Sequence, residues 1–256
     1  MAITASVLYG PTGEQYSTYS PEVGAANTGR WPLGTQLVLP DNRKFRFAYA
    51  GGSNLVMGTM QQQSAAIANH VLQTPTAASV GATSVSVALG ATAAVVNQYK
   101  DGTLAIELGT GKGQAFGVAA HAAVSSSGTF VVPLAHGESV QVAIPATSNS
   151  VSLLSSPWYK VIQMPTTYTG MAVGVAMNTL TTLKFGWLQT RGPAAVLTNG
   201  TVVVGAFVVP SGTTAGAVEA ASTTIATTVA QGIQVGFVQH VATSTNNSTI
   251  FLTIDS

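Results

Sequence analysis

Residues 83–89 read TSVSVAL and residues 103–108 read TLAIEL, and both stretches alternate apolar side chains with small or polar ones. Their apolar positions are Val85, Val87 and Leu89, followed by Leu104, Ile106 and Leu108. Alternation with period two places every second side chain on the same face of an extended chain. Each stretch is therefore predicted to be a half-buried β-strand.

The same alternation recurs along most of the chain. It is clear in residues 139–144 (SVQVAI), 233–241 (IQVGFVQHV) and 249–255 (TIFLTID). The apolar positions there are Val140, Val142 and Ile144; Ile233, Val235, Phe237 and Val241; and Ile250, Leu252 and Ile254. Glycine, proline and asparagine separate these stretches at turn-sized intervals, which is typical of sandwiches and barrels. We expect an all-β fold with antiparallel β-sandwich or barrel-like domains and little helix.

Two segments are compatible with some helix. Ser64 is an acceptable N-cap for a short helix that would end before Pro75, and a loop fits the same residues equally well. Residues 215–230 are rich in alanine, but their β-branched threonine pairs and Gly216 favour loop and strand.

The chain divides into three segments by composition. Residues 1–62 are rich in proline and weak in periodicity at their start, and we expect an extended N-terminal arm that ends in a β-hairpin. The hairpin turn is predicted at residues 40–42 (PDN), between strands at residues 37–39 and 43–49. The rest of the chain is predicted to form two β-domains, residues 63–156 and residues 157–256.

The chain is poor in charge. Of 256 residues, 9 are basic and 8 are acidic, whereas 46% are hydrophobic. This composition argues against a disordered chain, which combines low hydrophobicity with high charge. A net charge of +1 argues against nucleic-acid binding, and no apolar run reaches the roughly 18–20 residues that cross a bilayer. We therefore expect no nucleic-acid partner and no membrane partner.

No stretch carries the signature of a catalytic or cofactor site. Residues 109–114 (GTGKGQ) look like a phosphate loop, but Gly113 follows Lys112 where a Ser or Thr would bind magnesium, so we interpret them as a turn. The absence of cysteine excludes disulfides and thiolate chemistry. The four histidines are scattered, and a metal site would require His121 and His136 to meet on paired strands. We expect no enzyme activity, no cofactor and no metal.

The densest charge lies in residues 41–47 (DNRKFRF). On a strand, Lys44 and Arg46 share one face, opposite the face of Arg43 and the two phenylalanines. Two interpretations remain open. These cations either solvate an edge strand and block unwanted pairing, or they contact an acidic protein surface.

Two aromatic pairs have equally open roles: Trp158 with Tyr159, and Phe185 with Trp187. Core packing is the default for such side chains. The alternative is a subunit contact, because tryptophan and tyrosine are favoured where an apolar ring is buried against another protein. Trp158 and Trp187 are the candidate oligomer contacts.

Several ordered stretches resemble a family of structural virion proteins of tailed bacteriophages. They are LVLPDNRKFRFAYAGG (residues 37–52), NQYKDGTLAIELGTGKGQAFGVAAHAAV (97–124), LLSSPWYKVIQ (153–163), KFGWLQTRGPAAVLTNGTVVVGAFVVPSGTTAGAVE (184–219), VGFVQH (235–240) and FLTID (251–255). The members that the chain is similar to are capsid decoration, or cement, proteins. The resemblance implies a β-rich homotrimer bound to the major capsid protein on the outer surface of the shell, with no catalytic residues.

The expected function is therefore decoration of a phage capsid by a virion protein synthesised in the host cytoplasm. The N-terminal segment supplies the candidate capsid contacts, which are Arg43, Lys44, Arg46, Tyr9, Tyr16 and Tyr19. The alternatives are another virion component (a tail, collar or head-fibre protein) and a glycan-binding β-module. Exposed aromatic side chains clustered on one face would favour the glycan binder.

Overall fold

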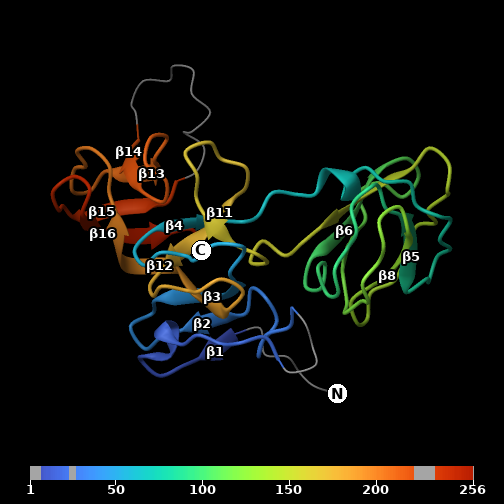
Figure 1. The fold of residues 1–256 in the computed structure, drawn as a ribbon, viewed down its shortest axis with the longest axis horizontal. Helices are drawn as coiled ribbons and strands as arrows, with labels where there is room; N and C mark the ends of the chain where they lie inside the picture. The colour runs from blue at the N-terminus through green and yellow to red at the C-terminus, as the bar shows by residue number, and fades with distance from the viewer. Residues whose placement is uncertain (1–6, 23–26, 222–233, 256) are drawn as a thin grey trace. The chain divides into compact units, whose positions relative to one another are not determined.

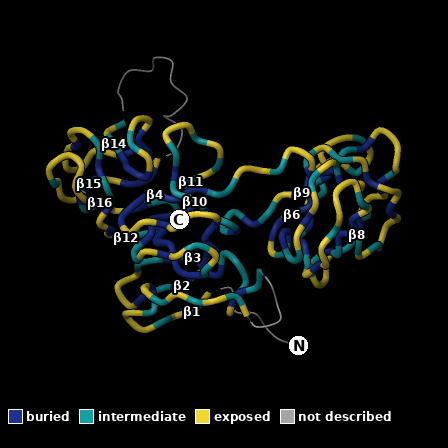
Figure 2. Tube along the Cα trace, in the orientation of Figure 1, coloured by how far each residue is buried: buried dark blue, intermediate teal, exposed yellow. Residues whose placement is uncertain are grey.

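The computed structural model describes residues 7–22, 27–221 and 234–255, and these form two compact units (Figure 1). The terminal unit contains Met1–Pro21, Gly29–Ala65 and Pro157–Ser256. The inserted unit contains Glu22–Thr28 and Ala66–Ser156. Figure 2 shows buried stretches along the strands and exposed residues at many of the turns that join them.

The terminal unit is built on one large sheet. Its main path runs in the order β1 (Val7–Tyr9), β2 (Gln36–Val38), β3 (Lys44–Tyr49), β12 (Phe185–Leu197), β16 (Asn247–Thr253), β15 (Gly236–His240), β13 (Phe207–Pro210) and β14 (Val218–Ala220). Three further strands join it off this path: β4 (Met60–Gln62), β10 (Ile162–Gln163) and β11 (Ala172–Ala176). Among the described residues, the strands of this sheet pair antiparallel except β1 and β2, which are parallel.

Aromatic side chains fill the core under β2, β3 and the start of β12. Phe47 stacks on Phe185 with ring centroids 5.5 Å apart, and Trp187 packs against Phe47 at 5.0 Å. The core beside β12, β16, β15 and β13 is instead aliphatic. Its buried side chains include Val196, Val208, Val238, Ile250 and Leu252. The long strand β12 thus contributes to both cores.

The inserted unit holds two small sheets around one core. One sheet pairs β5 (Ser84–Ala88) with β8 (Thr129–Pro133); the other has the order β7 (Ala115–Gly117), β6 (Thr103–Leu108) and β9 (Ser150–Leu154). Both sheets contribute to a single buried cluster that includes Val85, Val87, Leu104, Ile106 and Phe130.

Buried polar groups also order this core. The Tyr99 hydroxyl hydrogen-bonds to His70 Nδ1, and the backbone N–H of Tyr99 donates to His121 Nε2 at 3.0 Å. His121 Nδ1 lies 2.8 Å from the carbonyl oxygen of Ala122 and donates to it, so His121 is neutral in this arrangement. Burial lowers the pKa of His121, and the bond to Ala122 only partly offsets that effect.

The all-β prediction is confirmed. Among the described residues the only helical elements are two 3₁₀ turns, η1 (Glu14–Tyr16) and η2 (Ala68–His70), and η2 occupies the segment where a helix and a loop were both open. The predicted hairpin forms as β2 and β3, with Asn42 in the turn at φ 65°. Ile233 and most of residues 215–230 lie outside the described residues.

The structure divides the chain differently from the three predicted segments. Ala66–Ser156 lie in one unit, close to the bounds of the predicted first domain, but the segment predicted as an arm, apart from Glu22–Thr28, belongs with the second domain. The physical reason is burial: Leu37, Phe45 and Phe47 are fully buried beside Trp187. The N-terminal segment therefore supplies strands and core side chains to the terminal unit.

Candidate functional site

Three phenylalanines form a row on the outer face of the terminal sheet. Phe207 on β13 lies opposite Phe237 on β15, and Phe237 lies opposite Phe251 on β16. Pro193 on β12 continues the row opposite Phe251. Directly opposed residues of antiparallel strands share a face, so these side chains lie side by side across four strands. We call these four residues the phenylalanine row.

The row is exposed while its strand neighbours are buried. Phe207, Phe237 and Phe251 are 47%, 41% and 39% exposed, whereas Val208, Val238 and Ile250 on the opposite face are 2% exposed or less. A contiguous apolar patch on a folded surface marks a place where another molecule binds, and phenylalanine is enriched in protein interfaces. The row is the candidate protein-binding surface of this chain.

The sequence pattern predicted this row only in part. In β16 the alternation was correct, since Ile250 and Leu252 are fully buried, and it leaves Phe251 on the outer face. In β15 it was wrong: Val235 and Phe237 were expected on one face, but Val235 is buried and Phe237 is exposed. The strand begins only at Gly236, so Val235 lies outside its alternation.

The hairpin cations are largely engaged within the chain. Arg43 Nε lies 2.7 Å from Asp41 Oδ2. Phe45 is buried while Lys44 and Arg46 are half-buried, so the predicted division of faces is correct. However, β3 pairs with β2 on one side and with β12 on the other. It is not an edge strand, and the edge-solvation interpretation does not apply.

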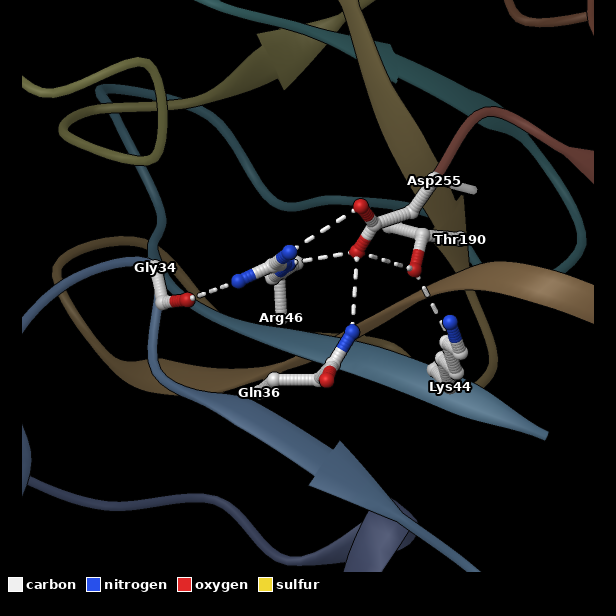
Figure 3. A network of polar contacts seen from close by, with 6 residues as sticks. All are labelled: Gly34, Gln36, Lys44, Arg46, Thr190 and Asp255. Atoms are coloured by element: carbon white, nitrogen blue, oxygen red, sulfur yellow. Dashed lines mark hydrogen bonds and ion pairs between the residues drawn. The ribbon is translucent and has the colours of Figure 1, made fainter. Parts of the chain in front are cut away.

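Arg46 belongs to a polar network that joins β3 to the C-terminal segment (Figure 3). Its Nε donates to Asp255 Oδ2 at 2.6 Å, its Nη2 to Asp255 Oδ1 at 3.0 Å, and its Nη1 to the carbonyl of Gly34 at 2.9 Å. Gln36 also donates to Asp255. Burial by itself raises the pKa of Asp255, but the hydrogen bonds and charge of Arg46 outweigh it and lower that pKa.

The three candidate tyrosines differ in accessibility. Tyr9 is 85% exposed and Tyr16 is 49% exposed, so both can meet a partner. Tyr19 is only half-buried, but its ring packs edge-on against Trp31 at 5.2 Å and its hydroxyl hydrogen-bonds to Glu14. Tyr19 therefore stabilises the terminal unit, whereas Tyr9 and Tyr16 remain available as contacts.

The two candidate tryptophans also differ. Trp187 is 3% exposed and packs in the aromatic core, so core packing describes it and its ring is not accessible to a second subunit. Trp158 is half-buried and lines a pocket of about 230 Å³ together with Met171 and the Arg46–Asp255 pair. Trp158 remains the accessible one of the two.

The described residues hold no group of three or more histidines, aspartates and glutamates placed to bind a metal ion. The glycine-rich stretch GTGKGQ forms the connection between β6 and β7, with Gly109, Gly111 and Gly113 all at positive φ. It is a turn, as interpreted from its sequence. In the same described part of the chain, no helix has the length and apolar character of a membrane span.

Comparison of the chain with protein-family models, with curated proteins and with solved structures found no match.

Proposed function

We propose that this chain is a structural virion protein that decorates the outer surface of a tailed-phage capsid. The observation that carries the proposal is the phenylalanine row, the candidate protein-binding surface. Exposed aromatic side chains on one face are also expected of a glycan binder, but the side chains of phenylalanine and proline offer no hydrogen-bond group to sugar hydroxyls, so the row favours a protein partner. The sequence resemblance to capsid decoration proteins supplies the kind of partner, the major capsid protein.

Apolar attachment agrees with how the chain uses its charges. Of the three cations expected to contact the shell, Arg43 and Arg46 already pair with Asp41 and Asp255. Releasing either cation for an intermolecular contact costs its intramolecular bonds, and exposed ion pairs contribute only about 0–1 kcal/mol. Burying the exposed part of a phenylalanine ring contributes about 1 kcal/mol, and the row offers three such rings. The row is therefore the stronger attachment surface.

A decoration protein also benefits from repetition. On a capsid lattice many copies bind at fixed spacing, and self-contacts between neighbouring copies add to each contact with the shell through effective concentration. We propose that the chain is a homo-oligomer, with the trimer as the expected state. Trp158, beside its pocket, is the candidate residue for the contact between copies.

The proposal is tested by adding the purified chain to capsids that lack it and measuring co-sedimentation. The double variant Phe237→Ser/Phe251→Ser removes the centre of the row without touching the core. Val131→Ser is the matched control, because Val131 is also exposed on a strand (57%) but lies in the inserted unit. We expect the control to bind as the natural chain does and the double variant to lose binding. Equal binding by all three proteins would overturn attachment through the row.

Another virion component is the second candidate, since a tail, collar or head-fibre protein also needs an apolar contact surface. The two candidates differ in location. A decoration protein binds empty shells that carry no tail, whereas a tail or collar protein does not.

A further inference from the structure

A pocket of about 230 Å³ opens at the opposite end of the strand order from the phenylalanine row, beside β1. Its lining combines an apolar floor, two aromatic rings and one group of each charge. The residues are Leu8, Tyr9, Gly10, Pro11, Glu14, Arg30, Trp31 and Leu37. We propose that this pocket binds a neutral pyranose sugar.

The aromatic walls suit the faces of a sugar ring. A pyranose presents aliphatic C–H groups on its faces and hydroxyls around its edge. The negative face of an aromatic ring attracts such C–H groups while the contact excludes water. Tyr9 offers a ring that is 85% exposed, and Trp31 offers a half-buried one at the same pocket.

The charged groups suit the hydroxyl edge. Glu14 supplies carboxylate acceptors and Arg30 supplies several N–H donors, and both line the pocket. A purely apolar ligand would take the Arg30 guanidinium and the remaining acceptor positions of Glu14 out of water without offering either a hydrogen bond, which is costly. A phosphorylated ligand would meet the repulsion of Glu14 beside a single guanidinium. Hydroxyls, which both donate and accept, satisfy the two groups together.

The pocket is largely formed before a ligand arrives. Trp31 is held edge-on by Tyr19 at 5.2 Å and by Phe47 at 5.2 Å, and Arg30 lies 5.0 Å above its ring. The Tyr19 hydroxyl donates to Glu14 and orients that carboxylate. Such a site loses little entropy on binding. Gly10 permits the close approach of the chain to the floor, because a Cβ there would lie 2.5 Å from Leu37 Cδ1.

The size of the pocket also selects the ligand. Sites for drug-sized molecules enclose about 300–1,000 Å³, so this pocket suits a single ring. A proline-rich peptide also docks on aromatic side chains, but it lies along an extended groove. The compact pocket with paired opposite charges favours the sugar, and the peptide is an outcome of the test.

The test is saturation-transfer NMR on the purified full chain with methyl α-glucoside, methyl α-galactoside and methyl α-mannoside at millimolar concentration. We expect transfer to the ring protons of at least one glycoside. Tyr9→Ala is expected to weaken that binding at least tenfold, and Glu14→Gln, which keeps an acceptor for Tyr19, is expected to weaken it less. Tyr16→Ala is the matched control, since Tyr16 is exposed on the same segment outside the pocket, and it should bind as the natural chain does.

Three outcomes would overturn the proposal. They are no transfer to any of the three glycosides, equal binding by the Tyr9→Ala and Tyr16→Ala variants, and Tyr9-dependent binding of a polyproline hexapeptide with none of a glycoside. The Phe237→Ser/Phe251→Ser variant separates this site from the proposed decoration function. It should lose capsid binding and keep glycoside binding.

Discussion

The guanidinium of Arg46 and the carboxylate of Asp255 form a two-point ion pair, although the residues lie 209 positions apart in the chain. The pair joins strand β3 to the segment that follows β16, and its side chains are only 24% and 22% exposed. The contact therefore ties the N-terminal part of the terminal unit to its C-terminal end.

Replacing Asp255 with Asn should destabilise the terminal unit by about 1–2 kcal/mol, because Arg46 would keep its charge in a half-buried place with a weaker acceptor. Asp41→Asn is the matched control. Asp41 pairs with Arg43 at 2.7 Å, but its side chain is 53% exposed, so the loss should stay below about 0.5 kcal/mol. Urea unfolding followed by tryptophan fluorescence measures both, since all three tryptophans lie in the terminal unit. Equal losses would contradict this ranking.

Acidification should destabilise the inserted unit through His121. Burial lowers the pKa of His121 from its ordinary 6.5, so the unfolded chain binds a proton at a higher pH than the folded chain does. The stability due to neutral His121 is complete above about pH 6.5 and is lost as the pH falls toward the lower folded-state pKa. Amide hydrogen exchange of β6 and β9 between pH 8 and pH 5, corrected for intrinsic rates, measures this loss.

The His121→Gln variant tests whether His121 causes that pH dependence. Its side-chain oxygen can still accept from the backbone N–H of Tyr99, but it does not titrate near neutral pH. We expect the amide protection of β6 and β9 to change less between pH 8 and pH 5 in this variant than in the natural chain. If amide protection in the variant depends on pH as steeply as in the natural chain, a group other than His121 causes the pH dependence.

Gly109→Ala should destabilise the inserted unit strongly. Gly109 lies at φ +84°, and a Cβ there would lie 1.5 Å from Asn149 Oδ1 and 2.4 Å from the carbonyl oxygen of Ser148. Because the second contact is backbone, we expect a loss of about 2–5 kcal/mol. Gly113→Ala is the control: it has φ +93° with nothing within 4 Å, so only the backbone cost of about 1–2 kcal/mol applies. If both variants lose similar amounts of stability, contacts with Asn149 and Ser148 do not cause the destabilisation by Gly109→Ala.

The alternation of apolar residues predicted where the strands lie, but it predicted less well which of their apolar side chains are exposed. Val85, Val87, Leu104 and Ile106 are buried as expected, yet Leu108 at the end of the same pattern is 58% exposed. The register between β6 and β9 shifts between Ile106 and Leu108, which turns Leu108 outward. Such a shift depends on the partner strand, so the local sequence does not reveal it.

The candidate site was predicted less completely for a similar reason. Composition indicated a folded chain that is poor in charge, but whether an aromatic ring is buried or exposed depends on which strands pair. Trp187 on β12 packs against Phe47 of the neighbouring strand β3 and is buried, whereas Phe207, Phe237 and Phe251 meet only because β13, β15 and β16 are neighbours. Strand order is a property of the whole fold, and it assembles the row.

Each phenylalanine of the row should contribute separately to the affinity for capsids. Each of Phe237→Ser and Phe251→Ser is expected to weaken binding of one copy by about tenfold, or about 1.4 kcal/mol, and the double variant by more. Titration of capsids with labelled protein measures the affinities. Raising the salt concentration should leave them nearly unchanged, because apolar contacts are not screened. If binding weakens steeply as the salt concentration rises, the chain attaches through Arg43, Lys44 and Arg46 and not through the row.

Decoration of the shell is measured most directly by a cryo-electron-microscopy map of virions from a phage whose genome encodes this chain. We expect density for the chain at regular positions on the outer surface of the icosahedral shell, with the face formed by β12, β16, β15 and β13 against the major capsid protein. Density confined to the tail or collar, or virions that lack the chain, would refute the decoration function.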